Sequence, residues 1–238
     1  MSNKFLFILI ASGLLAAGCI KEPIGKNESG TFVDSRDNRE YKWFRIGEQV
    51  WMAENLAWLP SMNGQAVGSD TNPAYYVYGY MGTSVVEAKL TSNFINYGVL
   101  YNREASLTAC PGGWSLPGDS DWKELELFLG MSALSVDSLD VRFSGSVGKK
   151  LKSVSGGNNG GDDDNTNGFN ALPAGGGNTS CVFGGLGEYA VFRTSTESGA
   201  SYSIVRALGF IDDGVIRGET EHAGGYSVRC LFNKTTGM

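Results

Sequence analysis

The chain has 238 residues, of which 34 are glycine and a single one is histidine. The glycine content is roughly twice the average of globular proteins, while the hydrophobic content of 42% is ordinary. With 19 basic and 25 acidic residues the net charge is −6, and no long basic run occurs. Nucleic-acid binding, which needs a basic surface, and a metal site built on several histidines are therefore excluded.

The first 18 residues form a short apolar leader. Lys4 is followed by residues 5–17, which carry no charge. This run is too short to cross a membrane and fits the apolar core of a signal peptide. The letters LAAG then precede Cys19, and this segment resembles the lipobox at which bacterial lipoprotein precursors are cleaved. The resemblance implies a mature chain that begins at a lipid-modified Cys19; an ordinary secretory signal followed by a chance cysteine is the alternative.

The chain divides into four segments. Residues 1–18 are the expected signal peptide, 19–30 a tether, 31–233 one domain and 234–238 a tail. The tether contains charges, proline and glycine without an apolar period, and no shift in composition divides the domain. We expect the protein in the bacterial cell envelope, anchored by the lipid on Cys19 to the outer membrane or cell surface.

The domain begins with strand signals. Residues 31–33 and 40–46 alternate and carry aromatic and β-branched side chains, and the turn-forming residues 34–38 separate them. Residues 47–51 predict a second turn that leads into a strand. Residues 50–59 have apolar side chains at a helical spacing, which predicts a helix there.

The middle of the domain holds the clearest helix. Residues 75–80 contain four tyrosines and predict an aromatic strand or an ordered loop, and residues 100–108 predict a short helix. Residues 119–129 follow Gly118, a tolerable N-cap, and have acidic residues in the first turn. We expect this helix to bury Trp122 and Leu125 against a sheet.

Residues 155–178 differ from the rest, because eight of these 24 residues are glycine and six are asparagine. Such a long stretch inside a domain is usually functional or mobile. Strands are predicted after it, joined by glycine and aspartate turns that include a hairpin signal at residues 212–214. The predicted strands are residues 189–194, 203–211, 214–217 and 226–232.

Several separate motifs carry a family resemblance. They are IGEQVWMAENL at 46–56, YGVLYN at 97–102, CPGGWSLP at 110–117, GFNALP at 168–173 and YSVRC at 226–230. Their order and spacing resemble the signature segments of the Fibrobacter succinogenes major paralogous domain. The resemblance implies an α+β fold that is C-type-lectin-like and related to formylglycine-generating enzymes, with short strands, a few short helices and long irregular loops.

Three cysteines remain after lipidation of Cys19, and an exported chain favours disulfides. Cys110, Cys181 and Cys230 allow three single pairings. The lectin-like topology implied by the resemblance brings the two halves of the domain together, so Cys110–Cys230 is the expected pair and Cys181 the free thiol. A reactive cysteine pair of the formylglycine-generating type is the alternative, but it needs two neighbouring cysteines in the C-terminal part.

One segment matches the first half of a calcium loop. Asp163, Asn165 and Asn167 stand at alternate positions before Gly168, which offers oxygen ligands for Ca²⁺. The twelfth position of the loop is Ala174, so the bidentate glutamate is missing. An Asx-rich turn is the preferred interpretation and calcium the alternative. We expect no other cofactor.

Candidate ligand-binding residues are Tyr76 and Tyr78, together with Asn165 and Asn167 of the glycine-rich stretch. Aromatic rings stack on sugars, and amides supply hydrogen bonds. His222 is expected at the surface or in a hairpin. Three tryptophans are assigned to the core instead: Trp51, Trp114 and Trp122.

Together these features favour a non-catalytic binding or adhesion module for a glycan, a peptide or a protein, with the membrane as a second partner through Cys19. The support is location and fold analogy. An enzyme of the formylglycine-generating type is one alternative. A purely structural envelope protein is another, and it predicts a partner-sized apolar patch without a ligand pocket.

Overall fold

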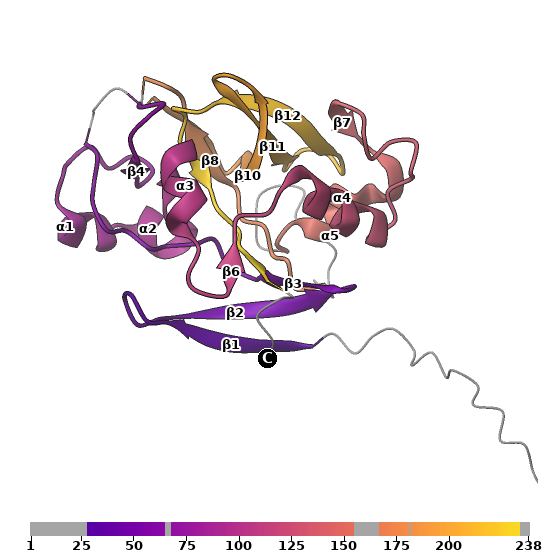
Figure 1. Ribbon diagram of the computed structural model, residues 1–238, viewed down its shortest axis with the longest axis horizontal. Helices are drawn as coiled ribbons and strands as arrows, with labels where there is room; N and C mark the ends of the chain where they lie inside the picture. Colours follow the sequence, from indigo (N-terminus) through magenta and orange to yellow (C-terminus); the bar gives the residue numbers. More distant parts are fainter. Residues whose placement is uncertain (1–27, 65–67, 155–166, 181, 234–238) are drawn as a thin grey trace, which may run out of the picture.

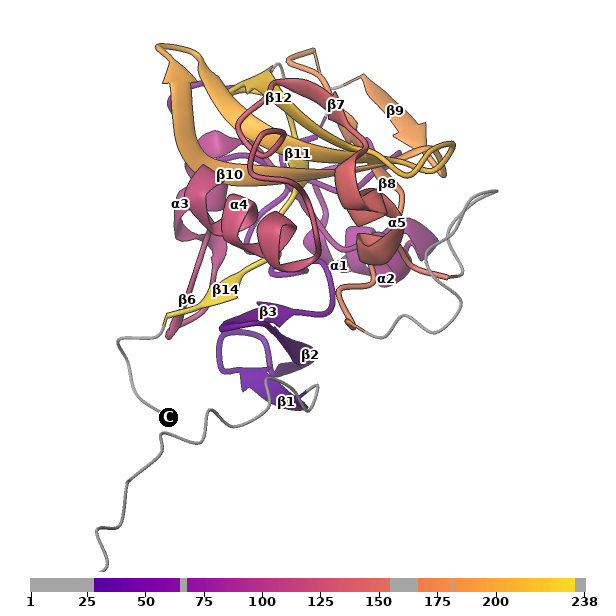
Figure 2. The same ribbon diagram turned by 90° about the vertical axis from the view of Figure 1, so that its right-hand side faces the viewer.

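The computed structural model describes residues 28–64, 68–154, 167–180 and 182–233. The domain is mixed α+β, with mostly strands and short helices, as the sequence predicted at this level. Two sheets face each other, and α3 (Arg103–Ala109) and α4 (Asp119–Phe128) lie between them (Figures 1 and 2). Among the described residues, no helix combines the length and the apolar character needed to span a membrane.

The smaller sheet joins the two ends of the domain. It is antiparallel and has the order β1-β2-β3-β14-β6. The predicted N-terminal hairpin is confirmed, as is the turn into β3. The C-terminal strand β14 pairs with β3, so the end of the domain closes onto its beginning. The strands are β1 (Ser29–Asp34), β2 (Arg39–Ile46), β3 (Gln49–Met52), β6 (Trp114–Ser115) and β14 (Leu231–Phe232).

The larger sheet has the order β4-β5-β13-β10-β11-β12-β7, and β8 and β9 branch from it as a hairpin that pairs with β10. The predicted hairpin signal at residues 212–214 is confirmed, because β11 and β12 are antiparallel neighbours. The strands are β4 (Tyr75–Tyr76), β5 (Leu100–Tyr101), β7 (Asp140–Arg142), β8 (Ala174–Gly177), β9 (Phe183–Leu186), β10 (Tyr189–Gly199), β11 (Tyr202–Gly209), β12 (Val215–Glu221) and β13 (Tyr226–Ser227).

Three short helices begin at side-chain caps. Ser84, Thr91 and Asn102 each accept a hydrogen bond from the backbone N–H three residues later, which satisfies a donor that the first helical turn leaves free. The predicted helix at residues 100–108 therefore begins only after Asn102, because residues 100–101 belong to β5. The other short helices are α1 (Val85–Lys89), α2 (Ser92–Tyr97), α5 (Val147–Leu151) and the 3₁₀ turn Ser144–Ser146.

The predicted helix α4 is confirmed. It begins after Gly118, whose backbone N–H donates to the Asp121 carboxylate at 2.7 Å. Trp122 and Leu125 are fully buried. The Trp122 ring lies 5.1 Å from Trp51 and 5.6 Å from Phe169, so aromatic packing fixes the helix over the core. The three tryptophans assigned to the core, Trp51, Trp114 and Trp122, are all buried.

The predicted helix at residues 50–59 is wrong. After β3 this segment has no helix, because its backbone donors bond to distant residues. The Met52 N–H donates to the Cys230 carbonyl at 3.1 Å, and the Leu56 N–H donates to the Val228 carbonyl at 2.9 Å. The same contacts interrupt the predicted strand at 226–232, which forms β13 and β14 instead.

The expected disulfide between Cys110 and Cys230 is confirmed, with the two Cα atoms 5.9 Å apart. It joins the end of α3 to the segment just before β14 and so reinforces the closure of the smaller sheet. Cys19 and Cys181 lie outside the described residues, as do the predicted signal peptide and most of the predicted tether.

Candidate functional site

The motif residues build the frame of the domain. Arg229, in the YSVRC segment, is fully buried and has no solvent access. Its Nη2 donates to Asn55 Oδ1 at 2.7 Å, and its Nη1 donates to the Phe169 carbonyl. The guanidinium also lies 4.6 Å from the Phe169 ring, and burial lowers its pKa. One side chain therefore fastens three motif segments together, and these residues are structural rather than ligand-facing.

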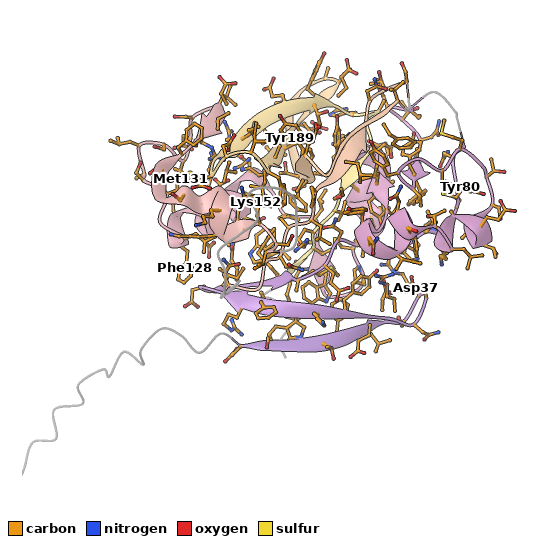
Figure 3. The ribbon with its side chains drawn as sticks, turned by 180° about the vertical axis from the view of Figure 1, so that it is seen from behind. Asp37, Tyr80, Phe128, Met131, Lys152 and Tyr189 are labelled. Carbon is orange, nitrogen blue, oxygen red and sulfur yellow. A yellow bond between two sulfur atoms is a disulfide. The ribbon has the colours of Figure 1, made fainter. Side chains whose placement is uncertain are left out.

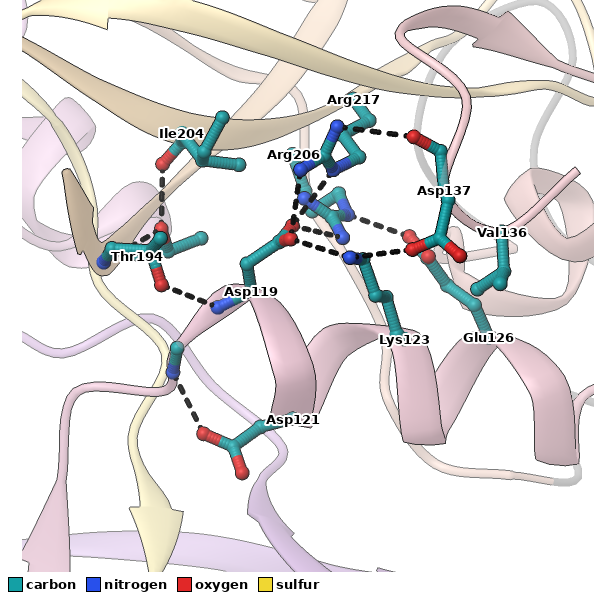
Figure 4. Close-up of polar contacts among 12 residues, drawn as sticks. Asp119, Asp121, Lys123, Glu126, Val136, Asp137, Thr194, Ile204, Arg206 and Arg217 are labelled. Atoms are coloured by element: carbon teal, nitrogen blue, oxygen red, sulfur yellow. Dashed lines mark hydrogen bonds and ion pairs between the residues drawn. The ribbon is translucent and has the colours of Figure 1, made fainter. Parts of the chain in front are cut away.

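A second buried network fastens α4 to the larger sheet (Figure 4). Glu126 is fully buried and accepts hydrogen bonds from Arg142 and Arg206. Two turns earlier on the same helix, Asp119 is paired with Arg206, Arg217 and Lys123, each within 3 Å. Burial alone would raise the pKa of Asp119, but the hydrogen bonds from its cationic partners bring that pKa well below its ordinary value. Each carboxylate is thus held by more than one cation where α4 packs on the larger sheet.

The β8–β9 hairpin branches from the larger sheet (Figure 2). The residues of this hairpin line an open groove. Its volume is about 440 Å³, within the usual range of ligand sites. Glycines at residues 175–177 and 184–185 form much of its lining. Of the other described lining residues, four are aromatic or charged and could contact a ligand: Phe183, Glu188, Tyr189 and Tyr226.

The glycines of the groove serve two different purposes. Gly176 is required by packing, because a Cβ there would lie 2.6 Å from the Tyr226 ring. Gly184 has no such neighbour, since a Cβ there would meet nothing within 4 Å, and its φ is not positive. Gly176 and Gly184 are directly paired across β8 and β9, so a side chain at either position would point to the same face of the hairpin. The absence of a side chain at Gly184 leaves open space beside Tyr226.

Buried interactions hold the Tyr226 ring in place. Its hydroxyl accepts a hydrogen bond from Thr220 Oγ1 at 3.0 Å. The Arg193 guanidinium lies 5.0 Å from the ring centre, and it donates to the carbonyls of Glu221 and His222 at 2.8 and 3.0 Å. Burial lowers the pKa of Arg193 to about 10. The ring is therefore positioned before any ligand arrives.

Tyr189 supplies the exposed aromatic surface of the groove, with 37% of its surface accessible. Glu188 is the charged side chain among the described lining residues. The two tyrosine rings can stack on an apolar ring face of a ligand. The Glu188 carboxylate can accept hydrogen bonds from hydroxyl or amine groups of that ligand. The carboxylate disfavours an anionic ligand.

The structure corrects part of the predicted ligand surface. Tyr76 is only 4% exposed and packs with Leu100, so it offers no ring to solvent. Tyr78 is half-buried, with its ring 5.1 Å from Phe183, so it supports the groove from behind. His222 occupies a turn, as one of the two expectations had it, but it is buried rather than at the surface.

The calcium prediction falls largely outside the described residues, since Asp163 and Asn165 are not among them. Asn167 is described, and its Oδ1 accepts a hydrogen bond from the Phe169 N–H at 2.9 Å. Its Nδ2 donates to the Lys150 carbonyl. Asn167 therefore forms the expected Asx turn. Across the described ranges, no cluster of three or more His, Cys, Asp or Glu side chains could hold a metal.

Sequence reasoning pointed to the glycine-rich stretch but missed Phe183, Tyr189 and Tyr226. The glycine triplet at residues 175–177 and the glycine pair at 184–185 were the signal for a hairpin without side chains. The tyrosines carried no local signal, because they approach the hairpin only through sheet pairing.

The fold and the groove define a β-rich α+β domain with a buried ionic frame and an open surface site. The chain belongs to the Fibrobacter succinogenes major domain family, whose profile matches residues 44–231. Comparison with curated proteins gave no match, and neither did comparison with solved structures.

Proposed function

We propose that the protein is an exported, lipid-anchored component of the bacterial cell envelope that acts as a non-catalytic binding module. The observation that carries this proposal is the groove at β8–β9, with its preset Tyr226 ring, its exposed Tyr189 and the open space over Gly184. The apolar leader and the lipobox-like segment before Cys19 support export and anchoring. The expected location is the outer membrane or the cell surface.

A C-type-lectin-like fold is part of the proposal. It is supported by the family membership and by the pairing of the C-terminal strand β14 with β3, which joins the ends of the domain. The disulfide supports a binding role over formylglycine-type chemistry, because it occupies Cys110 and Cys230.

A neutral or amine-bearing glycan is the ligand that this surface fits best. A sugar ring has a flat apolar face for tyrosine and hydroxyl groups for Glu188. The glycine floor admits such a ring without a steric barrier. Peptide or protein ligands are the competing outcomes of the test.

A glycan array probed with the mature protein tests the proposal. We expect saturable, calcium-independent binding that weakens at least tenfold in Tyr189→Ala and in Gly184→Leu, which fills the groove. Tyr202→Ala and Gly199→Leu are matched controls, because Tyr202 is 44% exposed outside the groove and Gly199 also has free space around its Cβ position. Binding that survives both groove changes refutes the site. A folded protein that binds no glycan refutes the carbohydrate ligand.

The anchor has its own test. Mass spectrometry of the purified membrane protein should find diacylglycerol on an N-terminal Cys19. The variant Cys19→Ser should associate with the membrane much more weakly than the parent. An unmodified Cys19, or a variant that associates with the membrane as strongly as the parent, contradicts the lipid anchor.

A further inference from the structure

Exposed apolar side chains gather along the segment from the end of α4 through β7. Their exposed fractions run from 42% to 94%, and Leu134 is the most exposed. Scattered exposed apolar residues are ordinary on a soluble protein, but a concentration of them in one part of the fold is a candidate interaction surface. This surface, here the apolar end, consists of Leu127, Phe128, Leu134, Leu139, Val141 and Phe143.

Local contacts hold the apolar end together. Arg142 points inward to Glu126, so its neighbours Val141 and Phe143 point outward. Both lie over Gly214, where a Cβ would be 2.5 Å from the Val141 side chain and 3.1 Å from the Phe143 ring. The Ser132 N–H donates to Ser144 Oγ at 2.9 Å, which brings the two ends of the segment side by side. The apolar side chains thus project from one part of the fold.

The N-terminal chain enters the domain beside this surface. The Glu28 carbonyl accepts a hydrogen bond from the Arg45 N–H at 2.7 Å, and the two side chains form an ion pair at 2.6 Å. Two residues further on, a Cβ at Gly47 would lie 2.8 Å from the Phe128 ring. Figure 3 accordingly shows Phe128 at the end of the molecule where β1 begins. In Figure 2 this end, with β7 and α4, faces the viewer.

The length of the tether argues for a lipid occupant. Residues 20–27 separate the proposed lipid on Cys19 from Glu28. Nine residue steps span at most on the order of 30 Å, and a flexible chain of that length averages about 17 Å. The anchored domain is therefore held against the bilayer at a high effective concentration, so even a weak contact becomes populated.

We propose that the apolar end rests on the bilayer to which the chain is anchored, an inference that rests on the proposed lipid on Cys19. Charges near this surface are mixed, with Lys123 and Lys150 on one hand and Asp137 and Asp140 on the other. Burial of apolar side chains at the lipid interface drives the contact, and attraction to anionic lipid does not. Binding is therefore insensitive to phosphatidylglycerol and to salt.

Depth-dependent quenching tests the contact in the full, lipidated protein. Leu134→Trp places a reporter in the apolar end. Leu90→Trp places one at the C-cap of α1, which lies at the opposite end of the domain from α4 and β7 (Figure 1), and Leu90 is 77% exposed. In vesicles of brominated phosphatidylcholine we expect the emission added by Leu134→Trp to fall at least twofold and that of Leu90→Trp to stay unchanged. Equal quenching of the two reporters, or none, overturns the proposal.

Flotation separates this proposal from the anchor itself. A chain that does not float with vesicles reports failure of the anchor, whereas a chain that floats without quenching at residue 134 refutes the bilayer contact alone. A second measurement uses the Cys19→Ser chain, in which adding Leu134→Ser and Phe143→Ser should weaken vesicle partitioning at least fivefold, and adding Leu90→Ser should not. A dimer that these serine changes dissociate would instead assign the apolar end to a contact between two copies, and would overturn the proposal.

Discussion

Glu126 offers the sharpest test of the buried ionic frame. Its carboxylate accepts two hydrogen bonds from Arg142, both at 2.8 Å, and one from Arg206 Nε at 2.7 Å. All three side chains are buried. Glu126→Gln keeps the size of the side chain and removes its charge. The change leaves two buried guanidinium groups with less compensation, and an uncompensated buried charge is costly.

The expected loss can be estimated from the partners that remain. Removing one member of a buried ion pair typically costs about 3–5 kcal/mol. Arg206 keeps Asp119 as a partner at 2.8 Å, which places this variant at the lower end, about 3 kcal/mol. In a domain of this size each kcal/mol lowers the melting temperature by about 2–4 °C, so a fall of about 6–12 °C follows.

Urea unfolding followed by tryptophan fluorescence measures the difference, because Trp122 lies on the same helix in the core. Glu124→Gln is the matched control: the same change on an exposed face of α4, expected to cost less than about 0.5 kcal/mol. A Glu126→Gln variant within about 1 kcal/mol of the parent would refute the assignment of this network as a stabilising frame.

Two further predictions concern acid and reduction. The pKa of Asp119 is lowered in the folded state, so its contribution to stability is complete well above the unfolded value of 3.8 and is lost as the pH falls below it. Asp119→Asn should therefore flatten the fall in unfolding free energy between about pH 5 and pH 3, and an unchanged slope in urea titrations would contradict this. Replacing Cys110 and Cys230 together with alanine opens a loop of 120 residues and should cost about 5 kcal/mol; equal unfolding midpoints with and without reductant in the parent would contradict it.

The elements that were predicted correctly from the sequence have signals of secondary structure within a few neighbouring residues. The β1–β2 hairpin follows from alternation around a turn, and α4 follows from Gly118 and the acidic first turn. One helix N-cap carried a sequence signal although no helix was predicted there. Serine at 84 and glutamate at 87 have the spacing of a capping box, and the Ser84 hydroxyl accepts a hydrogen bond from the Glu87 N–H at 3.3 Å. Five-residue helices such as α1 give too little apolar period to be noticed.

The errors have long-range causes. Residues 50–59 have helical spacing, yet the partners of Met52 and Leu56 lie more than 170 residues away at Cys230 and Val228. Tyr76 looked suited to a surface because its neighbours are aromatic, but the pairing of β4 with β5 buries it. The groove combines Tyr189 and Tyr226, which no spacing rule connects. Only the glycines at its floor were visible in the sequence.

The arrangement of the smaller sheet decides how the domain carries mechanical load. β1 is an edge strand, and its outermost pair is Ser29 with Phe44. A pull transmitted through the proposed lipid anchor would separate β1 from β2 one residue pair at a time, beginning at this pair, and would lengthen the connection to the domain by about 20 Å. The next strands resist, because β3 is paired with β14 and the disulfide ties the segment before β14 to α3. The β1–β2 hairpin should therefore open at a lower force than the rest of the domain, which the disulfide holds together.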